Sequence, residues 1–197
     1  VPSAIQKVTG GYSSPLEGWT WVPSTRQEAE LKESSFVAFA DGAACTWAIA
    51  SSEKVPILEQ TDAVVSYLEQ AGIGSTLPSL TMLISAAGEG KSTALMQVAC
   101  AMARKPEYRV LFNPRDGVIL PDRICALDRD HKWILVLDDA YRCIPLLFNA
   151  IAALQQRGCE HVHWICASRD SDWKIVKANE FPWAQYCVFR RFVYRGA

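Results

Sequence analysis

The sequence predicts an α/β protein built as a three-layer sandwich, with a mainly parallel central sheet between helices and a small helical segment before it. From residue 79 onward, apolar runs typical of buried parallel strands alternate with helical patterns, which favours a parallel sheet. The chain has 197 residues, of which 50% are hydrophobic and 21% charged. That is an ordinary globular composition and enough for one sizeable core.

The stretch 85–93 reads Ser-Ala-Ala-Gly-Glu-Gly-Lys-Ser-Thr and lies between an apolar run, 80–84, and a helical pattern, 94–103. Strand, glycine turn and helix in this order are the setting of a phosphate-binding loop. Gly88 and Gly90 let the backbone curl so that successive N–H groups point at one anion, and the next helix adds the positive end of its dipole. The predicted fold is therefore that of the P-loop NTPases.

The residues of this loop have expected roles in binding a nucleotide. Lys91 is expected to reach the β- and γ-phosphates, and the Ser92 hydroxyl to ligate Mg²⁺. The motif's first glycine is Ser85 here, so only the Gly-x-Gly-Lys-Ser part is strict. The predicted nucleotide-binding residues are Ala87, Gly88, Glu89, Gly90, Lys91, Ser92 and Thr93.

Two carboxylates follow a second buried run, 132–137. Asp138 is placed to hold the Mg²⁺ shell opposite Ser92. Asp139 is placed to polarise the water that attacks the γ-phosphate. The alternative is that the two acids cap the helix that follows them.

Arg169 follows a third buried run, 161–167. The carboxyl ends of parallel strands meet at one edge of a sheet, so Arg169 is expected beside the phosphate loop. Its guanidinium fork suits phosphate oxygens, which predicts a contact with the γ-phosphate. A surface salt bridge is the alternative. The predicted catalytic residues are thus Lys91, Asp139 and Arg169.

The identity of the nucleotide follows from a missing motif. Proteins that read guanine normally carry an Asn-Lys-x-Asp stretch, and this sequence has none. Adenine is therefore favoured, and the predicted ligands are ATP or ADP with Mg²⁺.

The chain divides into three predicted parts. Residues 1–35 form an N-terminal extension or linker with Trp19 and Trp21 as its large anchors, and a helix is expected to open over 24–28. Residues 36–78 form a helical entry segment and residues 79–197 the ATPase core. In the entry segment, two short helices are expected on either side of Gly42, followed by a longer helix over 62–70. In the core, strands are expected at 109–113 and 186–194, and helices at 121–127 and 141–156.

Charge and composition limit the kinds of partner and compartment that are expected. The formal net charge is −1, which gives no direct nucleic-acid signal, and no apolar run is long enough to span a membrane. Seven scattered cysteines without a C-x-x-C pair fit a reducing cytoplasm better than a disulfide scaffold or a zinc site. The histidines His161 and His163 are expected to be structural.

The motifs at 88–93, the acidic pair after 133–137, and Cys-Ala-Ser-Arg at 166–169 resemble those of the additional-strand P-loop ATPases. Within them, the chain is similar to the STAND class, signal-transducing ATPases with numerous domains, of the NACHT-like bacterial kind. Residues 36–43, followed by Thr-Trp at 46–47, resemble the entry segment that precedes such domains in bacterial defence proteins.

This resemblance implies a nucleotide-gated switch, with a role such as antiviral defence, in a longer chain that forms a homo-oligomer and carries sensor and effector domains. The sequence departs from the pattern at Asp139, where many relatives have glutamate. The helical lid and winged helix expected after Arg195 are missing, so we expect the chain to be one domain of a longer protein.

Two other functions stay open. One is a P-loop kinase that transfers phosphate to a small molecule, although the stretch 116–130 offers only Arg123 and Arg129 for the lid that such kinases need. The other is a nucleotide-dependent scaffold with little turnover, which Asp139 in place of glutamate favours.

Overall fold

A six-stranded sheet forms the centre of the computed structural model, which describes residues 13–25, 31–70, 75–114 and 117–193. The strand order is β1-β3-β4-β5-β2-β6, and β2 to β6 run parallel, whereas β1 pairs antiparallel with β3. This arrangement confirms the predicted mainly parallel sheet. The strands are β1 (Thr20–Trp21), β2 (Ser79–Ser85), β3 (Tyr108–Asn113), β4 (Lys132–Leu137), β5 (Val162–Arg169) and β6 (Val188–Val193).

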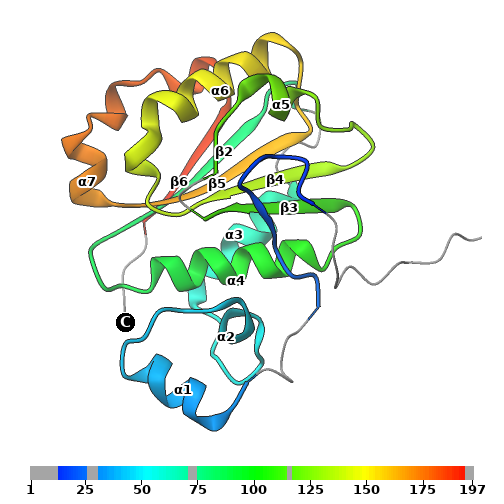
Figure 1. The fold of residues 1–197 in the computed structure, drawn as a ribbon. Helices are drawn as coiled ribbons and strands as arrows, with labels where there is room; N and C mark the ends of the chain where they lie inside the picture. The colour runs from blue at the N-terminus through cyan, green and yellow to red at the C-terminus, as the bar shows by residue number, and fades with distance from the viewer. Residues whose placement is uncertain (1–12, 26–30, 71–74, 115–116, 194–197) are drawn as a thin grey trace, which may run out of the picture.

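Helices cover both faces of the sheet, which completes the three-layer α/β fold of the P-loop NTPases (Figure 1). One layer holds α3 (Glu59–Gln70) and α4 (Lys91–Ala103). The other layer holds α5 (Pro121–Cys125), α6 (Ile144–Gln156) and α7 (Asp170–Ile175). Among the described residues, no helix is long and apolar enough to cross a membrane.

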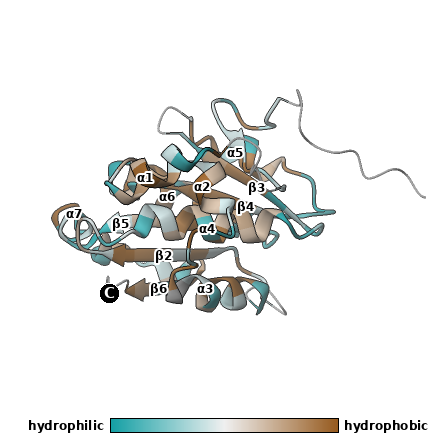
Figure 2. Cartoon of the chain, turned by 90° about the horizontal axis from the view of Figure 1, so that it is seen from below, coloured by the Kyte–Doolittle hydropathy of each residue, from teal (hydrophilic) through white to brown (hydrophobic). Residues whose placement is uncertain are grey.

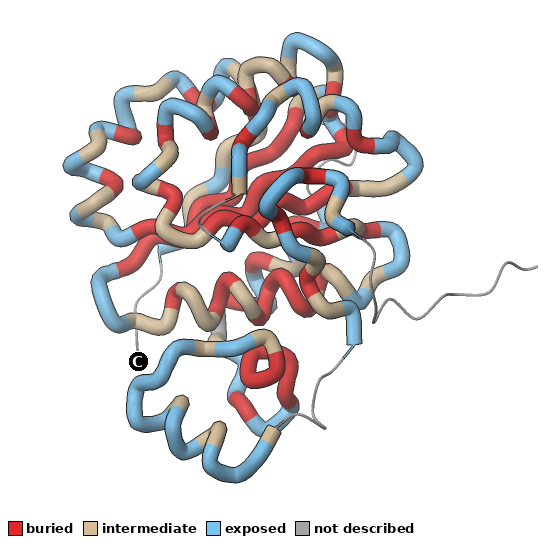
Figure 3. Tube along the Cα trace, viewed as in Figure 1, coloured by how far each residue is buried: buried red, intermediate tan, exposed pale blue. Residues whose placement is uncertain are grey.

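The first part of the entry segment lies outside α4, at the bottom of Figure 1. This part holds α1 (Glu33–Ala40), which begins three residues before the predicted segment, and α2 (Trp47–Ser51). They are the two short helices predicted on either side of Gly42. The Thr46 hydroxyl caps α2 by accepting the Ile49 N–H at 3.3 Å. Helix α1 contains no buried residue, and Figure 3 shows it in the colours of exposed and intermediate positions.

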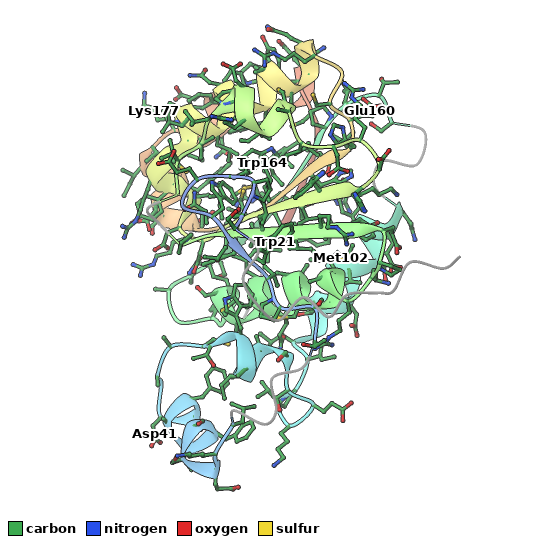
Figure 4. All side chains as sticks on the ribbon, turned by 45° about the vertical axis from the view of Figure 1, so that its right-hand side comes forward. Trp21, Asp41, Met102, Glu160, Trp164 and Lys177 are labelled. Carbon is green, nitrogen blue, oxygen red and sulfur yellow. The ribbon has the colours of Figure 1, made fainter. Side chains whose placement is uncertain are left out.

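The core is divided by the sheet into two apolar clusters because side chains alternate along each strand. Leu80, Met82 and Ile84 of β2 face the α5–α6–α7 layer, whereas Leu83 faces α4. On β5, Trp164 faces the α5–α6–α7 layer and Ile165 faces α4. Figure 2 shows β2 in the brown of apolar residues, and Figure 4 places Trp164 between the sheet and the helices above it. Burial on both faces explains why these strands read as continuous apolar runs.

Several boundaries differ from the predicted ones. Helix α6 begins at Ile144 instead of Tyr141, and a 3₁₀ turn, η2 (Ala140–Cys143), precedes it. Pro145 lies in the first turn of α6, where its missing N–H is tolerated. Helix α3 begins at Glu59 and α5 ends at Cys125, so the predicted 62 and 127 were wrong by two or three residues. The helix predicted over 24–28 falls mostly outside the described residues.

The N-terminal tryptophans belong to the core. Trp19 is 3% exposed, and its indole N–H donates to the Val118 carbonyl at 2.9 Å. The centroid of its ring lies 6.1 Å from the ring centroid of Trp164. Trp21 lies in β1 and contacts the ring of Trp133 at 5.9 Å. A two-residue strand is too short to show a periodic pattern, so β1 could not be predicted from the sequence.

A buried histidine makes folding stability depend on pH. His163 of β5 is 3% exposed, and its Nδ1 lies 2.7 Å from the Ser79 hydroxyl, with which it shares a hydrogen bond. Burial, aided by Lys132 and His161, lowers the pKa of His163 from 6.5 to about 4. The structural role predicted for this residue agrees with these contacts.

The folded state therefore binds fewer protons than the unfolded state between pH 6.5 and pH 4, so stability is full above this window and falls as the pH drops through it. Between pH 7 and pH 5 this one group is expected to cost about 2 kcal/mol of unfolding free energy. Urea unfolding at both pH values measures the change. A His163→Gln variant should show a smaller difference between the two, and an equal difference would contradict the assignment.

Candidate functional site

The phosphate loop joins the end of β2 to the start of α4, on the side of the molecule where α7 lies (Figure 1). Gly88 has φ +83° and Gly90 has φ +72°, and both values lie in the left-handed region that residues with a Cβ rarely adopt. Gly90 is also the N-cap of α4. The two glycines thus produce the curled backbone that the sequence predicts.

Lys91 is the first residue of α4 and is only 7% exposed. A buried cation is costly, and the positive end of the helix dipole is an unfavourable place for one. An anion bound in the loop would compensate both effects. The burial of Lys91 therefore points to a phosphate ligand at this position.

Two other loop side chains face the protein. The Glu89 carboxylate accepts the Ala86 N–H at 2.9 Å, so it folds back onto the loop. The Thr93 side chain lies near the Cys45 thiol of the entry segment, whose pKa is raised by burial, and Thr93 partly offsets that rise. Ser92, between Lys91 and Thr93 in the first turn of α4, is partly buried.

The two acidic residues follow β4 directly, as predicted. Asp138 Oδ1 accepts the Asp139 N–H at 2.9 Å, which fixes the direction of its carboxylate. Asp139 has φ 51° and ψ 42°, a left-handed conformation that aspartate and asparagine adopt more readily than other residues with a Cβ. Asp139 precedes η2 as its N-cap residue but makes no side-chain capping bond, which argues against the helix-capping alternative.

A cation lies near this carboxylate. Arg142 Nη2 is 3.8 Å from Asp139 Oδ2, and the Asp139 side chain is 17% exposed. At this distance the ion pair between Arg142 and Asp139 is loose.

Arg169 ends β5, the strand that lies between β2 and β4. Its backbone is in register with Ser85, the last residue before the phosphate loop. The side chain is 52% exposed, and its Nε lies 4.0 Å from Asp172 Oδ2. The sheet therefore places Arg169 beside the loop, and the side chain has a loose ionic partner there.

The oxygen donors at this edge suit magnesium. The Ser92 hydroxyl and the Asp138 carboxylate are hard ligands, and Mg²⁺ usually keeps several waters and takes its other ligands from phosphates. In the part of the chain that the structure describes, no group of three or more His, Cys, Asp or Glu residues could hold a metal ion. A metal at this site would thus depend on the nucleotide for part of its coordination.

Residues 37–180 match the model of the family described as novel STAND NTPase 5. The chain belongs to this family. The match begins inside α1 and ends in η3 (Ala178–Glu180), so it covers α2, α3 and strands β2 to β5, whereas β1 and β6 lie outside it. The resemblance inferred from the loop, the acidic pair and Arg169 is thereby confirmed at the level of the family.

Solved structures match the chain at low sequence identity. The S. cerevisiae Hsp104:casein complex has a TM-score of 0.49 at 13% identity, over 71% of this chain and 27% of the other. The Thermotoga maritima RuvB Holliday junction branch migration motor has a TM-score of 0.39 at 20% identity, over 68% and 44%. This chain spans less than half the length of either protein. No curated protein matches the chain.

Sequence reasoning missed the contacts between the entry segment and the loop. Besides the approach of Thr93 to Cys45, Leu58 packs against Gly90, since a Cβ on that glycine would lie 3.4 Å from Leu58 Cδ1. These contacts join residues 32 or more positions apart. Neither periodicity nor motif spacing reports such pairs.

Proposed function

We propose that this STAND NTPase domain binds ATP with Mg²⁺ at residues 87–93 and hydrolyses it. The observation that carries the proposal is Lys91, buried at the first turn of α4 behind a loop whose two glycines are left-handed. An anion at that point would offset the cost of the buried charge. A triphosphate is the anion that a strand, loop and helix of this kind accommodates.

In this proposal, residues at the carboxyl ends of different strands have different roles in binding and hydrolysis. Lys91 binds the β- and γ-phosphates, and Ser92 and Asp138 hold Mg²⁺, which neutralises charge that develops on the phosphates. Asp139 orients the attacking water and accepts its proton. Arg169 binds the γ-phosphate and thereby distinguishes ATP from ADP.

Hydrolysis would make the domain a switch between two nucleotide states in a longer signalling chain, as the family name suggests. Antiviral defence and a homo-oligomeric assembly in the cytoplasm are the setting that we propose for it. Support comes from the resemblance of residues 36–47 to the entry segment of bacterial defence proteins.

A phosphate-release assay tests the reaction, run with ATP and Mg²⁺, with and without small-molecule hydroxyl acceptors. A switch ATPase releases inorganic phosphate without an acceptor. A kinase transfers phosphate to the acceptor and releases little on its own. Binding without either product would indicate a nucleotide-dependent scaffold.

The scaffold is the second candidate because of Asp139. Its side chain is one methylene shorter than glutamate, and it has Arg142 as a loose ionic partner at 3.8 Å. Both features would slow the activation of water. In that case ATP binding alone would set the state of the domain.

Replacing Arg169 by alanine is expected to weaken ATP about tenfold or more and to leave ADP nearly unchanged, because only ATP offers the γ-phosphate. Titration of both nucleotides into parent and variant measures the difference. Arg157→Ala is the matched control: this arginine is similarly exposed (51%), is ion-paired with Asp122, and follows α6 at the opposite edge of the sheet. If the variant loses equal affinity for ATP and ADP, or loses none, Arg169 does not bind the γ-phosphate and serves only as the ionic partner of Asp172.

A further inference from the structure

Gln97 lies in the middle of α4 and is only 5% exposed. Its amide contacts the stretch that joins α2 to α3 and the first turn of α3. The amide nitrogen donates to the Pro56 carbonyl at 2.9 Å. The amide oxygen accepts the Leu58 N–H at 3.2 Å and the Thr61 hydroxyl at 3.3 Å.

These three bonds use most of what a glutamine can offer. An amide oxygen has two lone pairs, and both are engaged here. Thr61 is itself 3% exposed, so its hydroxyl has little access to water as a substitute partner. Buried hydrogen bonds of this kind hold two segments in a single arrangement, because leaving any of the groups unpaired is costly.

The segment that Gln97 holds reaches the phosphate loop. Leu58, whose N–H it accepts, places Cδ1 3.4 Å from the position of a Cβ on Gly90. Gly90 is the left-handed N-cap of α4 and directly precedes Lys91. Gln97 lies six residues beyond Lys91, about 9 Å along the helix axis. It is therefore too far to touch a phosphate and acts through Leu58.

We propose that Gln97 is a positioning residue for the phosphate loop: it fixes residues 56–61 so that Leu58 packs on Gly90 and keeps the loop curled for phosphate. The inference deepens the proposed function and rests on it for the ligand. It assigns the entry segment a part in nucleotide affinity. ATP and ADP should be affected alike, because both place phosphates in the loop.

The chain offers a matched control on the same helix. Arg104 follows α4, and its Nη2 donates to the Ser51 carbonyl of α2 at 3.0 Å. This bond also ties the entry segment to α4, but it lies about 20 Å from Lys91 along the axis. Arg104→Met should lower stability without reaching the loop.

The experiment compares the parent with Gln97→Met, Leu58→Ala and Arg104→Met. Methionine keeps the length and the helix propensity of glutamine and loses its hydrogen bonds. Two readouts are taken: hydrogen exchange of the loop amides at 88–91 without nucleotide, and the affinities for ATP and ADP. Thermal unfolding of each variant is recorded beside them.

Gln97→Met and Leu58→Ala are expected to speed exchange in the loop and to weaken ATP and ADP by a similar factor, about tenfold. Arg104→Met should keep both readouts within about twofold of the parent. The inference is overturned if Gln97→Met only lowers the melting temperature, or if Arg104→Met changes the loop equally. Absence of nucleotide binding by the parent would defeat the proposed function alone, and loop exchange would still decide the role of Gln97.

Discussion

Replacing Lys91 by alanine is expected to weaken ATP binding by about 1.5–3 kcal/mol, which is roughly tenfold to more than a hundredfold. The loss is large because the ammonium group is buried at the loop, where a charge-assisted contact with phosphate is poorly screened. Alanine is the best helix former, so α4 itself should not suffer. The substitution also removes a buried cation from a helix N-terminus, where it is unfavourable. The nucleotide-free variant should therefore be at least as stable as the nucleotide-free parent.

Titration of a fluorescent ATP analogue measures this change. The control is Lys105→Ala, which alters a lysine just beyond the opposite end of α4, where it pairs with Glu69. The affinity of Lys105→Ala for the analogue should match that of the parent. If Lys91→Ala binds the analogue as tightly as the parent does, the assignment of the site to this loop is wrong.

Replacing Asp139 by asparagine is expected to slow hydrolysis by about 10²–10⁴-fold while ATP affinity stays nearly the same. Asparagine retains the shape of aspartate and tolerates the left-handed backbone that this position requires, so the turn should be preserved. The variant loses only the charge that would accept a proton from water. Calorimetric titration gives the affinity, and phosphate release gives the rate.

Asp138→Asn provides the contrast. It should weaken binding in the presence of Mg²⁺ and have little effect in its absence, because Asp138 is assigned to the metal shell. Hydrolysis by Asp139→Asn at the parent rate would exclude this residue as the group that activates water. Loss of nucleotide binding by Asp139→Asn would instead indicate that Asp139 holds the metal and Asp138 activates the water.

The central strands could be predicted because burial on both faces leaves a plain mark in the sequence. The run at 133–137 is apolar throughout, and the runs at 80–84 and 162–167 are apolar except for Thr81 and His163. Each forms a strand of the parallel sheet. The edge strand β1 and the region after β5 carry no such mark. Helix α7 has six residues, and Trp183 beyond it donates its indole N–H to the Ala178 carbonyl in a local turn. Aromatic packing, with rings of Trp173 and Trp183 6.2 Å apart, holds that region together without periodicity.

The positions of the candidate residues followed from topology, whereas their contacts did not. Parallel strands put Asp138 and Arg169 at the same sheet edge as the loop, which needs only the order of the elements. The left-handed backbone of Asp139 and the bond of Glu89 to Ala86 arise from local geometry that no motif specifies. Gln97 looked like an ordinary helix residue, because its partners come from a segment about 40 positions earlier.

The most direct test is a structure of this chain with a non-hydrolysable ATP analogue and Mg²⁺. We expect the triphosphate in the loop at residues 87–93, with Lys91 Nζ within hydrogen-bond reach of the β- and γ-phosphates. We expect the metal between the Ser92 hydroxyl and the Asp138 carboxylate. A nucleotide bound elsewhere, or a loop that stays empty at saturating analogue while Lys91 remains buried, would contradict the proposed site.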